Sequence, residues 1–156
     1  MATKKMALIA TKGTLDMAYP PFILASTAAA LGWEVQIFFT FYGLTLLRHD
    51  ISDIKISPLA NPAMPMPVPM PVLVQALPGM EAMATMMMKQ KMKSKGVASL
   101  KELRDLCLEA EVKFVACQMT VDLFEFKQTD FIKELEFGGA ATFMKFAGES
   151  DVCLFI

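Results

Sequence analysis

Residues 33–41 read WEVQIFFTF, a run of β-branched and aromatic side chains that is the clearest predicted strand in the chain. Upstream, the apolar run 6–10 (MALIA) predicts a second strand that is buried on both faces, as in a parallel sheet. Between them, residues 14–31 predict a helix in which Pro20 and Pro21 are expected to introduce a kink or to delay the start. Together these elements form a βαβ unit with a right-handed crossover.

The rest of the chain continues this alternation. Further strands are predicted at 112–117 (VKFVAC) and 152–156 (VCLFI), and the fifth strand is either 55–57 or 135–137. Helices or helical turns are predicted at 42–48, 80–95, 100–110, 121–126, 129–130 and 140–148, with Ser99 and Glu102 forming a capping box before the third of these. The pattern predicts an α/β three-layer sandwich with a mostly parallel sheet of four or five strands.

Length and composition limit the class of protein. The 156 residues have the size of one domain, so residues 1–156 are expected to form a single unit. The formal net charge of −1 has no block of like charge, which argues against a nucleic-acid partner. A hydrophobic fraction of 54% excludes a disordered chain and raises the question of whether some apolar surface faces lipid or another subunit. Lys12 and Asp16 interrupt the only candidate secretory segment, so a cytoplasmic protein is expected.

A proline- and methionine-rich insertion occupies residues 57–80 approximately. It has no charged residue and the length of a membrane span, but seven prolines prevent the helix that a bilayer requires, so a polyproline-like loop is expected. In the helix that follows, one side is predicted to hold Met80, Met83, Ala84, Met87 and Met88. Nine of the 14 methionines lie between positions 64 and 92, which favours a contact surface over a Cu(I) site.

Ligands of open α/β sheets bind beyond the carboxyl ends of the strands, which here are the segments 11–14, 40–43 and 117–120. Cys117 stands at such an end, and Thr120 is the expected N-cap of the next helix. A helix N-terminus lowers the pKa of a nearby thiol, so Cys117 is the candidate reactive residue, with a buried structural cysteine as the alternative. Cys107 and Cys153 are expected to pack in the core.

Other catalytic and cofactor chemistries find little support. His49 is the only histidine and is expected to be solvated, so the pattern favours neither a zinc site nor a Cys-His hydrolase. Three cysteines without regular spacing are no disulfide framework. Gly13 lies in a TKGT turn that lacks the further glycines of a phosphate loop. No metal, nucleotide or other cofactor is expected.

Five ordered blocks carry a family resemblance: 11–16 (TKGTLD), 38–44 (FFTFYGL), 77–80 (LPGM), 116–120 (ACQMT) and 136–142 (EFGGAAT). Nearly end to end, the chain resembles the DsrE/DsrF-like proteins of the DsrEFH superfamily, which act in sulfur relay. The closest resemblance is to the branch found beside rhodaneses and TusA-like carriers. The resemblance implies an oligomeric α/β sandwich whose cysteine carries sulfur as a persulfide or thiosulfonate, and by position that cysteine is Cys117. Neither Cys107 nor Cys153 matches a second transfer cysteine of the family.

The resemblance therefore predicts a sulfur carrier or sulfurtransferase with rhodanese-like and TusA-like partners. The Cys117 thiolate is expected to attack sulfane sulfur and pass it to a partner thiol. Gly13, Tyr42, Gln118 and Thr120 are the candidate substrate-binding residues, with Phe41 beside Tyr42 as a wall of the pocket. The alternative is a non-catalytic adaptor that docks on a partner or a membrane edge through residues 56–92. Homo-oligomers would cover the excess apolar surface.

Overall fold

A computed structural model describes residues 2–57, 67–68 and 71–156. Its centre is a five-stranded sheet in the order β4-β3-β2-β1-β5, in which every neighbouring pair is parallel. The strands are β1 (Lys5–Ala10), β2 (Glu34–Phe39), β3 (Lys113–Cys117), β4 (Glu136–Gly138) and β5 (Val152–Phe155). Of the two candidates for the fifth strand, 135–137 is confirmed to within one residue, whereas residues 55–57 form no strand.

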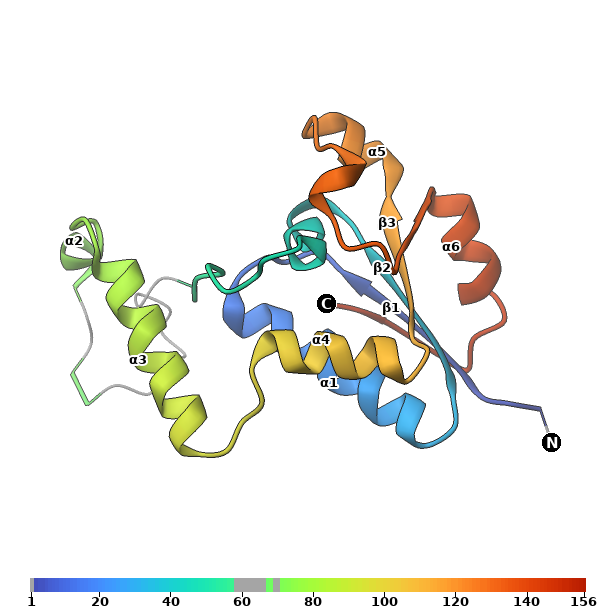
Figure 1. The fold of residues 1–156 in the computed structure, drawn as a ribbon, viewed down its shortest axis with the longest axis horizontal. Coiled ribbons are helices and arrows are strands. Elements are labelled where there is room, and N and C mark those ends of the chain that lie inside the picture. The colour runs from blue at the N-terminus through green and yellow to red at the C-terminus, as the bar shows by residue number, and fades with distance from the viewer. Residues whose placement is uncertain (1, 58–66, 69–70) are drawn as a thin grey trace.

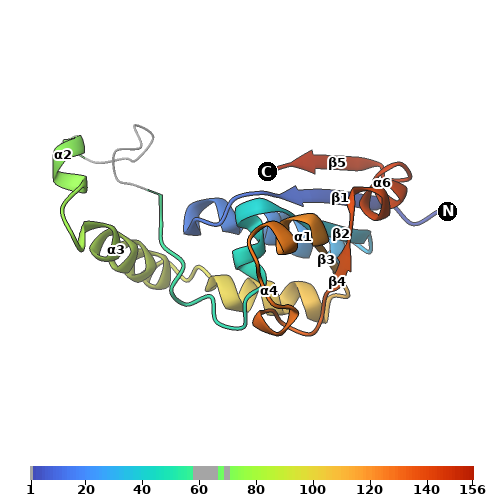
Figure 2. The ribbon, with the colours of Figure 1, turned by 90° about the horizontal axis from the view of Figure 1, so that it is seen from above.

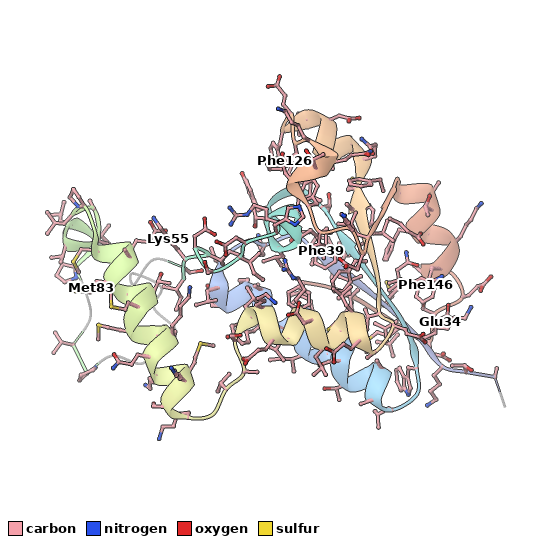
Figure 3. The ribbon with its side chains drawn as sticks, in the orientation of Figure 1. Glu34, Phe39, Lys55, Met83, Phe126 and Phe146 are labelled. Carbon is pink, nitrogen blue, oxygen red and sulfur yellow. The ribbon has the colours of Figure 1, made fainter. Side chains whose placement is uncertain are left out.

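Helices cover the two faces of the sheet unequally, which confirms the three-layer sandwich. Helices α1 (Leu15–Ala30) and α4 (Leu100–Glu109) pack side by side on one face, and α6 (Ala140–Ala147) lies on the other (Figures 1 and 2). Because strand side chains alternate, Phe39 points into the large core beneath α1 and α4 (Figure 3), whereas Phe38 points to the α6 face. There Phe38 stacks on Phe143 with ring centroids 5.0 Å apart.

Helix α1 begins at Leu15, so of the two effects predicted for Pro20 and Pro21, a kink or a delayed start, the delay does not occur. Both prolines lie inside the helix, where each removes one backbone donor. The burial of Pro21 and Phe22 against the sheet holds this segment helical, because tertiary packing supplies most of the stability of a helix. Helix α4 begins with the predicted capping box between Ser99 and Glu102.

Short helices follow two of the strands without a connecting loop. The 3-10 helix η1 (Phe41–Leu47) comes after β2, and α5 (Gln118–Leu123) starts directly after β3. The prediction had α5 begin at residue 121 with Thr120 as its N-cap. In the structure Cys117 occupies the N-cap position and Thr120 is the third helical residue. A second 3-10 turn, η2 (Gln128–Asp130), lies near the predicted turn.

The proline- and methionine-rich segment leads to two helices that extend away from the sheet, α2 (Val72–Gln75) and α3 (Met80–Ser94) (Figures 1 and 2). The polyproline-like loop was predicted over residues that include 58–66 and 69–70, which lie outside the described part of the chain. At 72–75 the backbone is helical instead. No described helix is both long and apolar enough to cross a membrane.

The inward side of α3 matches the predicted one in part, since Ala84 and Met88 face inward as expected. Ala84 is buried, and Met88 and Met92 pack against the main core, at the four-residue spacing of one helix side. Met83 and Met87 were expected on this side, but they are 47% and 63% exposed, and Figure 3 shows Met83 on the outer side of the helix. The prediction placed the apolar side about one residue out of phase along this methionine-rich helix.

Candidate functional site

The carboxyl ends of β2 and β3 meet at one edge of the sheet. Phe39 pairs in register with Ala116, so the next residues along the two strands, Thr40 and Cys117, are neighbours. The helices that leave these strands, η1 and α5, also contact each other. The site therefore lies where the rule for parallel sheets places it.

Cys117 closes β3 on the thinly covered face of the sheet. Its side chain belongs to the small cluster of Ala7, Phe38, Val115 and Phe143, because odd-numbered residues of β3 point toward α6. The residue is only 5% exposed, yet it is the last before a helix, where backbone N–H groups lack partners within the helix. The thiol is thus sheltered from bulk water but next to unused donors.

Burial is the largest single influence on Cys117 and raises its pKa. Hydrogen-bond donors facing the sulfur outweigh burial, so the pKa of Cys117 lies below its ordinary value of 9.0. These donors are the hydroxyl and backbone N–H of Thr120, the hydroxyl of Thr40 and the N–H of Met119. The Cys117 side chain makes no N-cap hydrogen bond to α5.

Thr40 and Thr120 form the polar centre of the site. Their hydroxyl oxygens lie 3.2 Å apart, and the N–H of Phe41 donates to the Thr120 oxygen at 3.3 Å. Thr120 is fully buried. The sequence identified Thr120 as a site residue, though by way of an N-cap role that it does not have. It placed Thr40 at a strand end and gave it no role, and only the pairing of β2 with β3 brings the two threonines together.

Gly13 lies against η1. A Cβ atom on Gly13 would stand 2.6 Å from both the carbonyl oxygen of Tyr42 and the hydroxyl of Thr45, and one on Gly43 would stand 2.1 Å from the carbonyl oxygen of Ala10. Side chains do not tolerate such contacts with backbone. The two glycines therefore let the end of β1 and the start of η1 interlock, and this fixes the position of Tyr42.

Aromatic side chains form an exposed rim beside the threonines. Phe41 and Tyr42 are 44% and 63% exposed. Phe124 stacks on Tyr42 and meets Phe41 edge-on, with centroid distances of 6.0 and 6.2 Å. Phe41 has a φ of 49°, a left-handed conformation that is costly for an aromatic residue. Gln118 donates its side-chain amide to Asp122 at 2.7 Å along α5.

The other two cysteines differ sharply in environment. Cys107 is fully buried and donates its thiol to the carbonyl of Phe22 at 3.3 Å, and burial raises its pKa to about 12, which confirms a core residue. Cys153 was also expected in the core, but it is exposed because β5 is an edge strand that α6 does not cover. Strands β1 and β2 separate it from Cys117 by at least about 14 Å, too far for an intrachain disulfide.

A surface cavity of about 810 Å³ lies elsewhere, between α1, α3 and α4. Its walls include Tyr19, Met92 and Leu100, and neither Cys117 nor the two threonines line it. His49 is exposed, with Nε2 3.1 Å from the carbonyl of Thr129. Cavity and histidine therefore stand apart from the strand-end site.

Comparison with known proteins identifies the family. A model of the DsrE/DsrF/DrsH-like family matches residues 2–155. The chain belongs to this family. Among DsrE-like relatives, it is 66% identical to the "Sulfur carrier protein DsrE2" of Allochromatium vinosum over the full length of both chains. It is 31% identical to the "Uncharacterized protein YrkE" of Bacillus subtilis, covering 99% of this chain and 98% of the relative.

Structural comparison supports the DsrE-like fold. The crystal structure of the ychN protein from E. coli superposes with a TM-score of 0.57, over 99% of this chain and all of that one. Sequence identity in this comparison is 9%, so the likeness concerns the fold. The predicted family and the predicted α/β architecture are both confirmed.

Proposed function

We propose that the protein is a sulfur carrier in which Cys117 holds the sulfur. The full-length identity of 66% to a sulfur carrier protein supports the activity. The observation that carries the choice of residue is the set of donors from Thr40, Met119 and Thr120 that lower the pKa of Cys117. Among the three cysteines it alone combines a lowered pKa with a place at the carboxyl edge of the sheet. Thiolate is the nucleophilic form of cysteine.

Loading and unloading are two thiol exchanges without net redox change. In loading, the Cys117 thiolate forms a bond to the terminal sulfur of a donor persulfide, R–S–SH, and the donor's S–S bond breaks, releasing R–S⁻ with the bonding pair. Cys117 is now a persulfide, Cys–S–SH, whose outer sulfur came from the donor. In unloading, an acceptor thiolate attacks that outer sulfur, and Cys117 leaves as thiolate. The donors that stabilise the thiolate at rest also stabilise this leaving group, so they assist the second step.

The substrate-facing residues of this proposal are Tyr42, Gln118 and Thr120, with Gly13 fixing the loop that bears Tyr42. The exposed aromatic rim of Phe41 and Tyr42 gives an approaching partner an apolar contact next to the sulfur. We propose rhodanese-like and TusA-like proteins as these partners, in the cytoplasm. Their cysteine persulfides supply the chemistry that the exchange requires.

A homo-oligomer belongs to the same proposal. Strand β5 leaves one edge of the sheet unpaired within the described residues, and its Leu154 and Phe155 are 37% and 73% exposed. An apolar edge strand that carries no charged residue or proline to block strand pairing favours contact with another chain. Light scattering on wild type and on Phe155→Lys tests this, with a lower mass expected for the variant and an equal mass contradicting it.

Intact-protein mass spectrometry tests the carrier assignment. Because Cys153 is exposed and would also react, the experiment uses the Cys153→Ala background. Incubation with polysulfide or tetrathionate should add about 32 Da for a persulfide or about 112 Da for a thiosulfonate, both removed by reductant. The adduct should vanish in Cys117→Ala/Cys153→Ala. An adduct that persists there would show that Cys117 is not the carrier residue.

Helices α2 and α3 favour a second candidate function, docking on a partner or membrane edge. The exposed apolar side chains of these helices and of the turn between them are Val72, Leu73, Leu77, Met83, Met86 and Met87. Exposed apolar patches of this kind mark interaction surfaces. Met86→Gln/Met87→Gln should weaken co-sedimentation with vesicles or pull-down of a purified sulfur-transfer partner. Unchanged binding in both assays would exclude the docking function for this surface.

A further inference from the structure

Thr40 and Thr120 lie 80 positions apart in the chain, yet their hydroxyls meet at 3.2 Å beside the sulfur of Cys117. The hydroxyl of a partly buried threonine at the end of β2 would ordinarily cap the helix that follows, here η1. Thr40 is the N-cap residue of η1, but its side chain makes no cap hydrogen bond. The hydroxyl lies instead 3.2 Å from that of Thr120, and it is among the groups that lower the pKa of Cys117.

The hydrogen bonds around Thr120 restrict where its proton points. A hydroxyl has one proton and two acceptor lone pairs. The N–H of Phe41 occupies one lone pair. If Thr40 donates to the other, the Thr120 proton is free to point to the sulfur. A chain of donors from Thr40 through Thr120 to the sulfur then satisfies both hydroxyls, and successive hydrogen bonds strengthen one another.

The backbone at Phe41 supports this arrangement. Its φ of 49° is an unfavourable conformation for a residue with a side chain. The same bend presents the Phe41 N–H and the Thr40 hydroxyl, from consecutive residues, to one oxygen atom. The interlocking of Gly43 with Ala10 holds η1 in place after the bend. Strain of this kind persists where the surrounding structure fixes it, and it clusters at functional sites.

We propose that Thr40 and Thr120 act as a coupled hydroxyl pair that stabilises the anionic sulfur of Cys117, so that Thr40 is a second functional threonine of the site. This inference rests on the proposed carrier role of Cys117 and goes beyond it by naming the groups that hold the anion. When the sulfur is charged, Thr40 donates its proton to Thr120 and Thr120 donates its proton to the sulfur. When the sulfur is protonated, the Thr120 O–H can rotate away, so the pair adapts to thiol and thiolate.

The side chains clustered with Cys117 are apolar, so the two threonine hydroxyls are the groups that can reorient when the sulfur ionises. The apolar side chains clustered with Cys117 come from β1, β2, β3 and α6, namely Ala7, Phe38, Val115 and Phe143. On α5, the carboxylate of Asp122 accepts the amide of Gln118. On η1, Tyr42 lies 63% exposed in the aromatic rim. Within the described residues, burial and hydrogen bonds account for the environment of the sulfur without a charged partner.

The test follows the alkylation rate of Cys117 by iodoacetamide against pH. In the Cys153→Ala background Cys107 should not be alkylated at a measurable rate, since its pKa is raised to about 12. Thr40→Val and Thr120→Val keep the side-chain shape and remove the hydroxyl. Thr85→Val is the matched control, because Thr85 is a buried threonine bonded to Ile56 and Glu81, away from the site.

Each single variant should alkylate more slowly at neutral pH, Thr120→Val by about tenfold because it loses the hydrogen bond to the charged sulfur, and Thr40→Val because the Thr120 proton is no longer directed to the sulfur. At high pH its rate should reach or exceed that of the parent, because the thiolate itself stays intact. The double variant should be little slower than the slower single variant, since either change already breaks the pair. Thr40→Ser should restore the parent profile, and Thr85→Val should leave it unchanged.

Two results would overturn the proposal. One is a Thr40→Val profile identical to that of the parent. The other is a double variant whose loss equals the product of the two single losses, which would mean that the hydroxyls act independently. Failure of the carrier role is a separate result, because it appears as a sulfur adduct that survives in Cys117→Ala/Cys153→Ala. The alkylation profiles do not depend on that outcome.

Discussion

The buried thiol of Cys107 should make the protein lose stability in mild alkali. The side chain is fully buried against α1, and burial raises its pKa from 9.0 to about 12. In the unfolded chain the thiol ionises above pH 9, whereas in the folded protein it stays protonated until about pH 12. The unfolded state therefore binds fewer protons across this window, and the free energy of unfolding falls as the pH rises.

The size of this effect follows from the two pKa values. At pH 8 neither state ionises appreciably, so the contribution of Cys107 is near zero. At pH 10 the unfolded thiol is about nine-tenths ionised and the folded thiol about one-hundredth, which lowers the free energy of unfolding by about 1.4 kcal/mol. The loss would approach about 4 kcal/mol only at pH 12, where lysine and tyrosine ionisation also contributes.

Urea denaturation at pH 8 and pH 10 measures the effect, with Cys107→Ala as the comparison. The variant lacks the thiol and should lose about 1.4 kcal/mol less than the wild type between the two pH values, although its stability at pH 8 is lower because a cavity is left. Cys153→Ala should keep the wild-type pH dependence, since Cys153 is exposed. Equal losses in wild type and Cys107→Ala would refute the assignment of Cys107 as a protonated core thiol.

Three further changes test other parts of the structure. Gly43→Ala should destabilise the protein by about 3 kcal/mol or more, because its Cβ would stand 2.1 Å from the carbonyl oxygen of Ala10. Gly139→Ala, with no atom within 4 Å of its Cβ, should change the stability by under about 1 kcal/mol in the same denaturation assay. Ser99→Ala should cost about 1 kcal/mol by removing the capping box of α4, and an unchanged melting curve would contradict that role.

Patterns within one element could be predicted from the sequence. The strands at 6–10, 33–41 and 112–117 were predicted because a parallel sheet buries both faces and requires continuous apolar runs. The capping box at Ser99 is local as well, since both partners lie within four residues. The phase of α3 was not predictable, because methionines surround most of the helix and give no contrast between its sides.

Other features depend on the order of the strands, which periodicity does not reveal. The run VCLFI predicts a buried strand, yet β5 is an edge strand and Cys153 is exposed. The start of α5 was misplaced because Thr120 is a common N-cap residue, whereas the strand runs into the helix without a loop. The meeting of Thr40 with Thr120 requires β2 and β3 to be neighbours, although 73 residues separate the two strands.

The role of the first glycine in the block EFGGAAT becomes clear only once the order of the strands is known. Gly138 of β4 pairs in register with Cys117. A Cβ on Gly138 would stand 3.2 Å from a methyl group of Val115 and 3.3 Å from the Cβ of Thr142 in α6, both tighter than ordinary contact. Glycine therefore lets the first turn of α6 approach β3 closely beside the cysteine. The close approach keeps the sulfur in a dry environment, where hydrogen bonds from the two threonines act on it more strongly than they would in water. Gly138 thus influences the chemistry of Cys117 through packing alone, because it has no side chain.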